Sequence, residues 1–157
     1  MELFDETLLE LNAVRKREGE ALAAAMLPKL TKIESLVKIV RDKMPELLAN
    51  LRSNLRDKFK ELEIECDPLR LEQELVFYAQ RMDNLEELDR LMAHITETRR
   101  LLAEDGAVGK KLDFLMQEFN REANTLASKA TTLEITQIAV ELKVLIEQLR
   151  EQVQNLL

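Results

Sequence analysis

The sequence contains few of the residues on which several other classes of protein depend. Its 157 residues include one cysteine, three glycines, three prolines, one tyrosine and no tryptophan. A single thiol, Cys66, excludes an internal disulfide and a cysteine-rich zinc site. Three glycines and three prolines are too few for the many turns of an all-β domain.

Long hydrophobic runs are also missing. The longest unbroken apolar stretch is Ala21–Leu27, whereas a membrane-spanning helix needs about 20 residues. The first residues, MELFDETLLEL, are acidic and lack the basic region of a secretory signal. We therefore expect a cytoplasmic protein with no membrane partner.

The residues that are present favour helices. Hydrophobic residues make up 46% of the chain and charged residues 34%, a balance typical of a globular protein. Apolar residues recur at helical spacing along the chain, and no strand-like alternation competes with them. The sequence predicts an all-α fold, in which long antiparallel helices form an elongated bundle with coiled-coil-like seams.

Two domains are predicted. Residues 1–66 should form an N-terminal helical hairpin, with a kink or break at Pro28 and a second helix starting at Pro45. Residues 67–157 should form a C-terminal helical domain. Its first helix is expected from Pro68 to about Ala103, with an apolar stripe made of Leu71, Leu75, Tyr78, Met82, Leu85, Met92 and Ile95.

Two more helices complete this domain. A loop at 104–109 precedes a helix that begins near Val108 and carries its apolar residues on one face: Leu112, Leu115, Met116, Phe119, Ala123 and Leu126. Thr131 and Thr132 separate it from a last helix, Leu133–Leu157. That helix is apolar enough to suggest an assembly surface.

The acidic excess is concentrated in one region. The chain has a net charge of −7, and residues 67–106 hold ten acidic but only five basic side chains. Nucleic-acid footprints are basic, so this region is not expected to bind phosphate passively. It is compatible with a site that binds a divalent cation.

Chemically useful side chains share one face of the helix predicted at 68–103. At 100° per residue, Asp83, Glu87, Arg90 and His94 fall within a narrow arc. Carboxylates suit Mg²⁺ or Mn²⁺, arginine suits phosphate, and histidine suits proton transfer. The alternative is a solvated face with ordinary ion pairs between neighbouring turns.

A second group lies on the following helix. Lys111, Glu118, Glu122, Thr125 and Lys129 share one side, and five further polar residues lie beside them: Lys110, Gln117, Arg121, Asn124 and Ser128. Glu118, Glu122, Arg121 and Lys129 are predicted to form a metal and phosphate surface, because short amide and hydroxyl side chains are unusual on a plain solvent face. An exposed ladder of ion pairs is again the alternative.

Three motifs, in order along the chain, resemble a known family. They are RMDNLEELDRLMAH at 81–94, GKKLDFLMQEFNREANTLASK at 109–129 and EQLREQVQN at 147–155. The stretch LNAVRKREG at 11–19 also fits. Together they resemble the C-terminal part of the YicC/YloC family of bacterial endoribonucleases.

The resemblance implies an RNA-cleaving enzyme that depends on a divalent cation, Mn²⁺ or Mg²⁺. It also implies homo-oligomers, hexamers in the described type, with RNA and not DNA as the partner. The implied catalytic residues are Glu87, His94, Glu118 and Glu122. The implied metal ligands are Asp83, Glu86, Glu87, Glu118 and Glu122. The implied RNA and phosphate contacts are Arg81, Arg90, Arg121, Asn124 and Lys129.

Two departures from the family pattern bear on this reading. Ala127 stands where the family usually has glycine, and the family's N-terminal half, which also contacts RNA, is missing. The resemblance therefore does not require that this chain alone be active. A non-catalytic helical module for oligomerisation or RNA binding is the alternative function.

Overall fold

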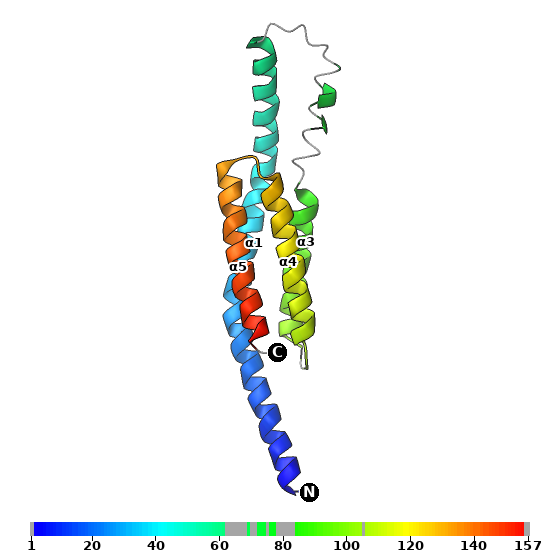
Figure 1. The fold of residues 1–157 in the computed structure, drawn as a ribbon, viewed down its shortest axis with the longest axis vertical. Helices are drawn as coiled ribbons and strands as arrows, with labels where there is room; N and C mark the ends of the chain where they lie inside the picture. The colour runs from blue at the N-terminus through cyan, green and yellow to red at the C-terminus, as the bar shows by residue number, and fades with distance from the viewer. Residues whose placement is uncertain are drawn as a thin grey trace.

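A computed structural model describes residues 2–61, 84–104 and 106–155, together with 69, 72–74 and 76–77. All regular elements in these ranges are helices: α1 (Glu2–Glu61), α3 (Leu85–Leu102), α4 (Gly109–Lys129) and α5 (Leu133–Gln154). They run alternately up and down, and each packs on its neighbours in an elongated bundle (Figure 1). The all-α prediction is confirmed.

The core lies where α1 passes the three shorter helices. Met26, Leu30, Ile33, Val37 and Val40 of α1 are fully buried there, against apolar residues from α3, α4 and α5. Ion pairs tie α1 to the bundle at its surface. Arg99 of α3 contacts Glu34 at 2.8 Å, and Lys43 contacts Glu134 of α5 at 2.8 Å.

The expected hairpin in residues 1–66 is wrong for the described part, because α1 continues through both Pro28 and Pro45. Each proline lies on the exposed side of the helix, where water can satisfy the carbonyl group that loses its partner. Met26 and Leu30, two residues before and two residues after Pro28, are buried in the core, and their packing stabilises the helix on both sides of the proline. The predicted boundary at 66–67 lies outside the described residues.

The helix expected over 68–103 also differs. Asn84 is not helical, and α3 starts at Leu85, so the predicted continuous helix is interrupted. The buried side of α3 is formed by Glu87, Leu88, Leu91, Ile95, Thr98 and Leu101, whereas Leu85 is 47% exposed. Of the predicted apolar stripe, Ile95 is buried and Met92 is partly buried against the core, whereas Leu85 is exposed. The buried side also includes Glu87, and His94 is partly buried.

The last two helices follow the prediction closely. All six apolar residues expected on one face of α4 are buried. The turn before α4 contains Gly106 at φ +139°, a conformation that side-chain-bearing residues rarely adopt. The Ile135 amide donates to Thr132 Oγ1 at 3.3 Å, which caps α5. Seven residues of α5 are buried inside the bundle, so most of its apolar surface is used within the chain.

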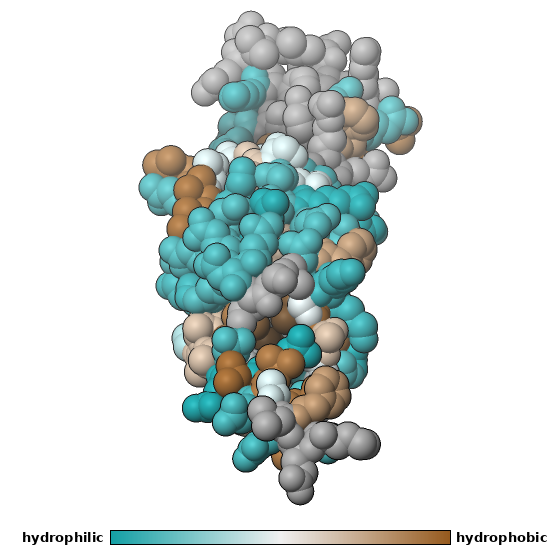
Figure 2. Space-filling view, turned by 60° about the horizontal axis from the view of Figure 1, so that its bottom comes forward, coloured by the Kyte–Doolittle hydropathy of each residue, from teal (hydrophilic) through white to brown (hydrophobic). Residues whose placement is uncertain are grey.

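Two ends of α1 extend beyond the other helices (Figure 1). Every described side chain from Phe4 to Glu20 is exposed. Several large apolar residues lie on this N-terminal extension: Phe4, Leu8, Leu9, Leu11 and Val14. In Figure 2, hydrophobic and hydrophilic surfaces lie side by side at the end of the molecule that is turned towards the viewer. None of the described helices is both long and apolar enough to cross a membrane.

Candidate metal centre between α3 and α4

The two polar groups found in the sequence face each other across the α3–α4 interface. The helices are antiparallel, so residue numbers that increase along α3 are paired with residue numbers that decrease along α4. Glu87 meets Lys129, Arg90 meets Glu122, and His94 meets Glu118 and Glu122. Neither helix alone predicts this ladder, because it depends on their register.

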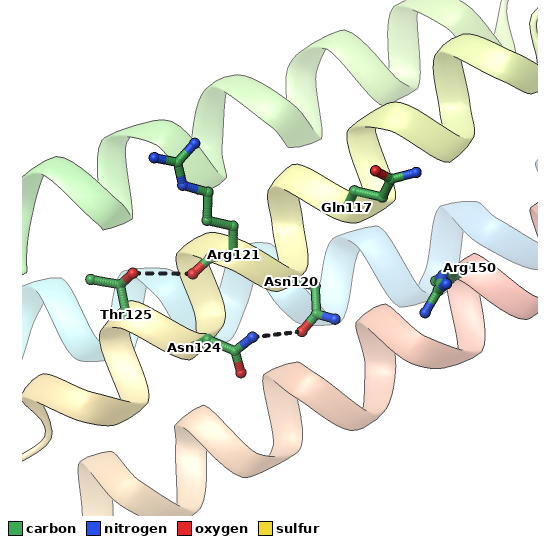
Figure 3. A pocket seen from close by; sticks show the side chains of 6 residues that line it. All are labelled: Gln117, Asn120, Arg121, Asn124, Thr125 and Arg150. Atoms are coloured by element: carbon green, nitrogen blue, oxygen red, sulfur yellow. Dashed lines mark hydrogen bonds between the residues drawn. The ribbon is translucent and has the colours of Figure 1, made fainter.

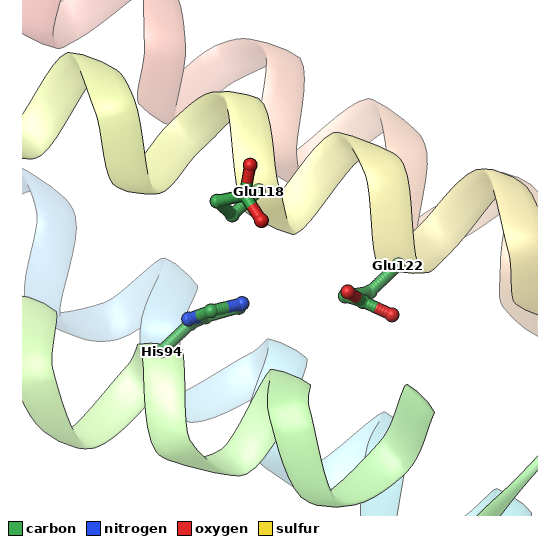
Figure 4. Close-up of side chains that lie close together, drawn as sticks. All are labelled: His94, Glu118 and Glu122. Carbon is green, nitrogen blue, oxygen red and sulfur yellow. The ribbon is translucent and has the colours of Figure 1, made fainter. Parts of the chain in front are cut away.

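His94, Glu118 and Glu122 form the centre of the ladder (Figure 4). One nitrogen or oxygen atom from each residue lies within 4.8 Å of the other two. Glu122 is only 2% exposed, and the other two are partly buried. A buried carboxylate needs a cation or hydrogen-bond donors close to it, since its desolvation is costly.

Arg90 supplies one such cation. Its Nη1 lies 3.3 Å from Glu122 Oε1, and the guanidinium also pairs with Glu86 one turn earlier on α3. The hydrogen bond to Glu122, with a further contribution from Glu86, raises the pKa of Arg90 above its ordinary value. Arg90 remains about half exposed, so it reaches the carboxylate from the solvent side.

The imidazole of His94 is held by its surroundings. Its ring centroid lies 5.6 Å from that of Phe119, with the two rings tilted by 60°. Thr98 Oγ1 donates to the backbone carbonyl of His94 at 2.8 Å. The Nε2 atom is buried and has no hydrogen-bond partner in the described part of the protein. Such an orphaned ring nitrogen is suited to binding a metal ion.

The three side chains fit a divalent cation. Two carboxylates and one imidazole are acceptable ligands for Mn²⁺, and Mg²⁺ prefers the carboxylates. Three protein ligands leave coordination positions for water and substrate, a pattern typical of catalytic metal centres. The same set is the one group of three histidine, cysteine, aspartate or glutamate residues with this geometry in the described ranges.

Other predicted site residues lie around this centre. Glu87 is nearly buried and accepts a 2.8 Å hydrogen bond from Lys129 Nζ. Glu86 is on the solvent side, paired with Arg90. Arg121 and Asn124 are exposed, and Arg121 lies 3.9 Å from Glu118. Arg81 and Asp83 lie outside the described residues.

The neighbouring surface of α4, towards α5, holds polar residues as well. A pocket between α4 and α5 is lined by six of them: Gln117, Asn120, Arg121, Asn124, Thr125 and Arg150 (Figure 3). Asn120 and Arg150 were not among the site residues predicted from the sequence. The spacing of Asn120 one turn before Asn124 was a usable signal, whereas no local pattern assigns Arg150 of α5 to this pocket.

Comparison with known proteins gives consistent matches. A family model described as "Endoribonuclease YicC-like, C-terminal" matches residues 40–157. A protein from Haemophilus influenzae named "Probable endoribonuclease YicC" is 51% identical over 153 residues, which are 98% of this chain and 53% of that protein. A protein of the same name from Clostridioides difficile is 32% identical over 97% of this chain and 53% of its own length. The chain thus spans about half the length of these relatives.

Proposed function

Since this chain belongs to the YicC-like endoribonuclease family, in which its residues 40–157 match the C-terminal model, we propose that it is part of a divalent-metal-dependent enzyme that hydrolyses RNA. The observation that carries the metal dependence is the convergence of His94, Glu118 and Glu122 within 4.8 Å. The names of the relatives support the endoribonuclease class.

In this proposal His94, Glu118 and Glu122 hold Mn²⁺ or Mg²⁺. A divalent cation supplies Lewis acidity and charge neutralisation for phosphodiester hydrolysis. Phe119 keeps the His94 ring in position, and Thr98 fixes the backbone beneath it. This packing holds the ligands on two rigid helices, which lowers the cost of arranging them.

The basic residues around the centre have separate tasks. Arg90 and Arg121 are exposed next to Glu122 and Glu118, where their guanidinium groups can bind phosphate oxygens of RNA. Lys129 forms a partly buried pair with Glu87, and we assign it to holding α3 against α4 at this end of the site. Glu87 acts with Lys129 in that role rather than as a ligand.

The test is cleavage of a labelled structured RNA with Mn²⁺, with Mg²⁺ and with a chelator. The key variant is Glu118→Gln with Glu122→Gln. Its matched control is Glu141→Gln with Glu151→Gln, which makes the same charge change at two exposed positions of α5. We expect metal-dependent cleavage that falls at least ~100-fold in the key variant and persists in the control.

Other outcomes would contradict parts of the proposal. Cleavage that persists in chelator would exclude the metal. Equal cleavage by the key variant and its control would exclude these carboxylates. No cleavage by the unaltered chain would exclude catalysis by this half alone and would favour the non-catalytic RNA-binding module.

We also propose that the chain self-associates. The apolar residues on the N-terminal extension of α1, Phe4, Leu8, Leu9, Leu11 and Val14, support this, because such clusters on protein surfaces commonly mark interaction sites. Sedimentation should show an oligomer that Leu9→Asp weakens, whereas Leu133→Asp, at another exposed leucine, should leave it intact. A monomer at micromolar concentration would refute this proposal.

A further inference from the structure

The pocket between α4 and α5 adjoins the candidate metal centre on the surface of α4, because Arg121 lines the pocket and lies 3.9 Å from Glu118. It has a volume of about 710 Å³ and is open to solvent. Five of its six lining residues come from α4, and Arg150 comes from α5 (Figure 3). Asn120 and Asn124 point towards α5, whereas the Arg121 side chain points away from α5 (Figure 3).

The lining is positively charged in a protein of net charge −7. It consists of two guanidinium groups, three carboxamides and one hydroxyl group, with no carboxylate. Asp113 accepts a 2.9 Å hydrogen bond from the Gln117 side-chain amide, and two more carboxylates make longer contacts with the lining: Glu118 lies 3.9 Å from Arg121, and Glu147 lies 3.5 Å from Arg150. An anionic ligand with hydrogen-bonding groups suits this lining.

One donor in the pocket wall lacks a partner. The Nε atom of Arg150 is buried and makes no hydrogen bond within the described residues. The ion pair with Glu147 uses the Nη1 atom instead. A buried donor without an acceptor is costly, so a rearrangement of the Arg150 side chain that brings Nε to a ligand oxygen would be favoured.

The amides of α4 also indicate a ligand. Asparagine is a poorer helix former than glutamate or lysine, yet Asn120 and Asn124 occupy the middle of α4 one turn apart. The Asn124 side-chain amide donates to Asn120 Oδ1 at 3.3 Å. This long bond is easily replaced by hydrogen bonds to a base edge, which asparagine pairs well.

Arg121 connects the pocket with the metal centre. It lines the pocket and lies 3.9 Å from Glu118, a predicted metal ligand. From Glu118 to Asn124 the distance along the helix axis is about 9 Å at 1.5 Å per residue. A flexible polynucleotide strand that crosses α4 over Arg121 would therefore reach both sides.

We propose that this pocket binds one nucleotide of a single-stranded RNA whose neighbouring phosphate lies at the His94–Glu118–Glu122 centre. Arg121 and Arg150 bind the backbone phosphates, and Asn120 and Asn124 hydrogen-bond the splayed-out base. This arrangement is typical of single-stranded RNA recognition. The inference rests on the proposed function and adds Asn120 and Arg150 to the residues that contact RNA.

The test measures binding of a short fluorescent single-stranded oligoribonucleotide by anisotropy, in chelator, so that neither metal binding nor cleavage contributes. Arg150→Gln is the main variant. Arg17→Gln is its matched control, because it makes the same substitution on the exposed N-terminal extension of α1. Asn120→Ala is a second variant that favours the helix, so weaker binding by it cannot come from unfolding.

We expect Arg150→Gln to weaken binding roughly 10-fold and to lower the slope of log Kd against log salt by about 1. Asn120→Ala should weaken binding about 5-fold, and Arg17→Gln should stay within about twofold of the unaltered chain. Binding by Arg150→Gln and Asn120→Ala that equals binding by Arg17→Gln would overturn the proposal. No binding by the unaltered chain would overturn it too.

The result is separable from that of the cleavage test. Binding that depends on Arg150 without any cleavage would keep the pocket and refute catalysis by this chain. Cleavage that depends on Glu118 and Glu122 but not on Arg150 would support the proposed catalysis and refute nucleotide binding in the pocket.

Discussion

The two polar sides of α4 are built differently. The side towards α3 is partly buried, and its charges are matched across the interface, Glu122 with Arg90 and Lys129 with Glu87. The side towards α5 is open, and its polar residues bond mainly within α4, as Asn124 does with Asn120 and Thr125 with the Arg121 carbonyl. The contrast is consistent with the proposed cation centre on one side and the proposed binding surface for an anionic ligand on the other.

The largest effect is expected from Phe119→Ala, because Phe119 is fully buried beneath the His94 ring. The cavity should lower the free energy of unfolding by about 3–5 kcal/mol. It should also weaken the packing of α3 on α4 more than the packing of α5 on α4. Phe114→Ala is the control, since Phe114 is on the same helix but 60% exposed. Denaturant unfolding of both variants measures the difference, and equal losses would refute this packing.

The Glu87–Lys129 pair should show the next largest effect. Removal of one partner leaves a nearly buried charge, so a double-mutant cycle with Glu87→Gln and Lys129→Met should give a coupling of about 1–2 kcal/mol. The exposed pair between Lys32 and Glu141 also joins two helices, and its coupling should stay below about 0.5 kcal/mol. Equal coupling energies would remove the distinction between buried and exposed pairs.

Arg90→Gln should have a smaller effect, and it should change the affinities for Mn²⁺ and for RNA in opposite directions. Without the guanidinium next to Glu122, Mn²⁺ should bind about two- to fivefold more tightly, because a competing cation is gone. RNA binding should weaken by a similar factor. Calorimetry and anisotropy measure the two effects, with Arg99→Gln on the same helix as the control. Weaker Mn²⁺ binding in Arg90→Gln would contradict the assignment.

The smallest expected effect is on the pH dependence of stability, and it concerns Glu34 of α1, which is on neither side of α4. Hydrogen bonds from Lys38 and Arg99 lower the pKa of Glu34 below 4.5. The group therefore stabilises the fold above its unfolded pKa, and this stabilisation is lost as the pH falls through the lower folded value. The unaltered chain should have a larger free energy of unfolding than Glu34→Gln, and this difference should shrink below about pH 4.5. Denaturant unfolding of both proteins at stepwise lower pH measures it. An advantage that grows on acidification would contradict the ion pair.

The fold and site could be predicted from sequence where local patterns decide. The spacing of Leu112, Met116 and Phe119 identified the buried face of α4, and Thr132 identified the start of α5. Pro28 and Pro45 misled the prediction, because tertiary packing of α1 overrides a local penalty at exposed positions.

The packing of the helices against one another, and their register, could not be predicted from the sequence. His94 and Glu118 were both candidates, but their proximity depends on the α3–α4 register and on which side of α3 is buried. The predicted stripe of this helix included Leu85, which is exposed, and left out Leu88 and Leu91, which are buried. Arg150 belongs to the pocket only because α5 packs beside α4. The site assignments and the metal themselves stay predictions.

Binding of Mn²⁺ measured by isothermal titration tests the central claim most directly, because it needs neither RNA nor catalysis. We expect one Mn²⁺ per chain, with an affinity that His94→Ala and Glu122→Gln each lower at least ~10-fold. The Glu141→Gln and Glu151→Gln control should bind as the unaltered chain does. Mn²⁺ binding that is unchanged in His94→Ala and Glu122→Gln, or absent from the unaltered chain, would exclude a metal site at His94, Glu118 and Glu122.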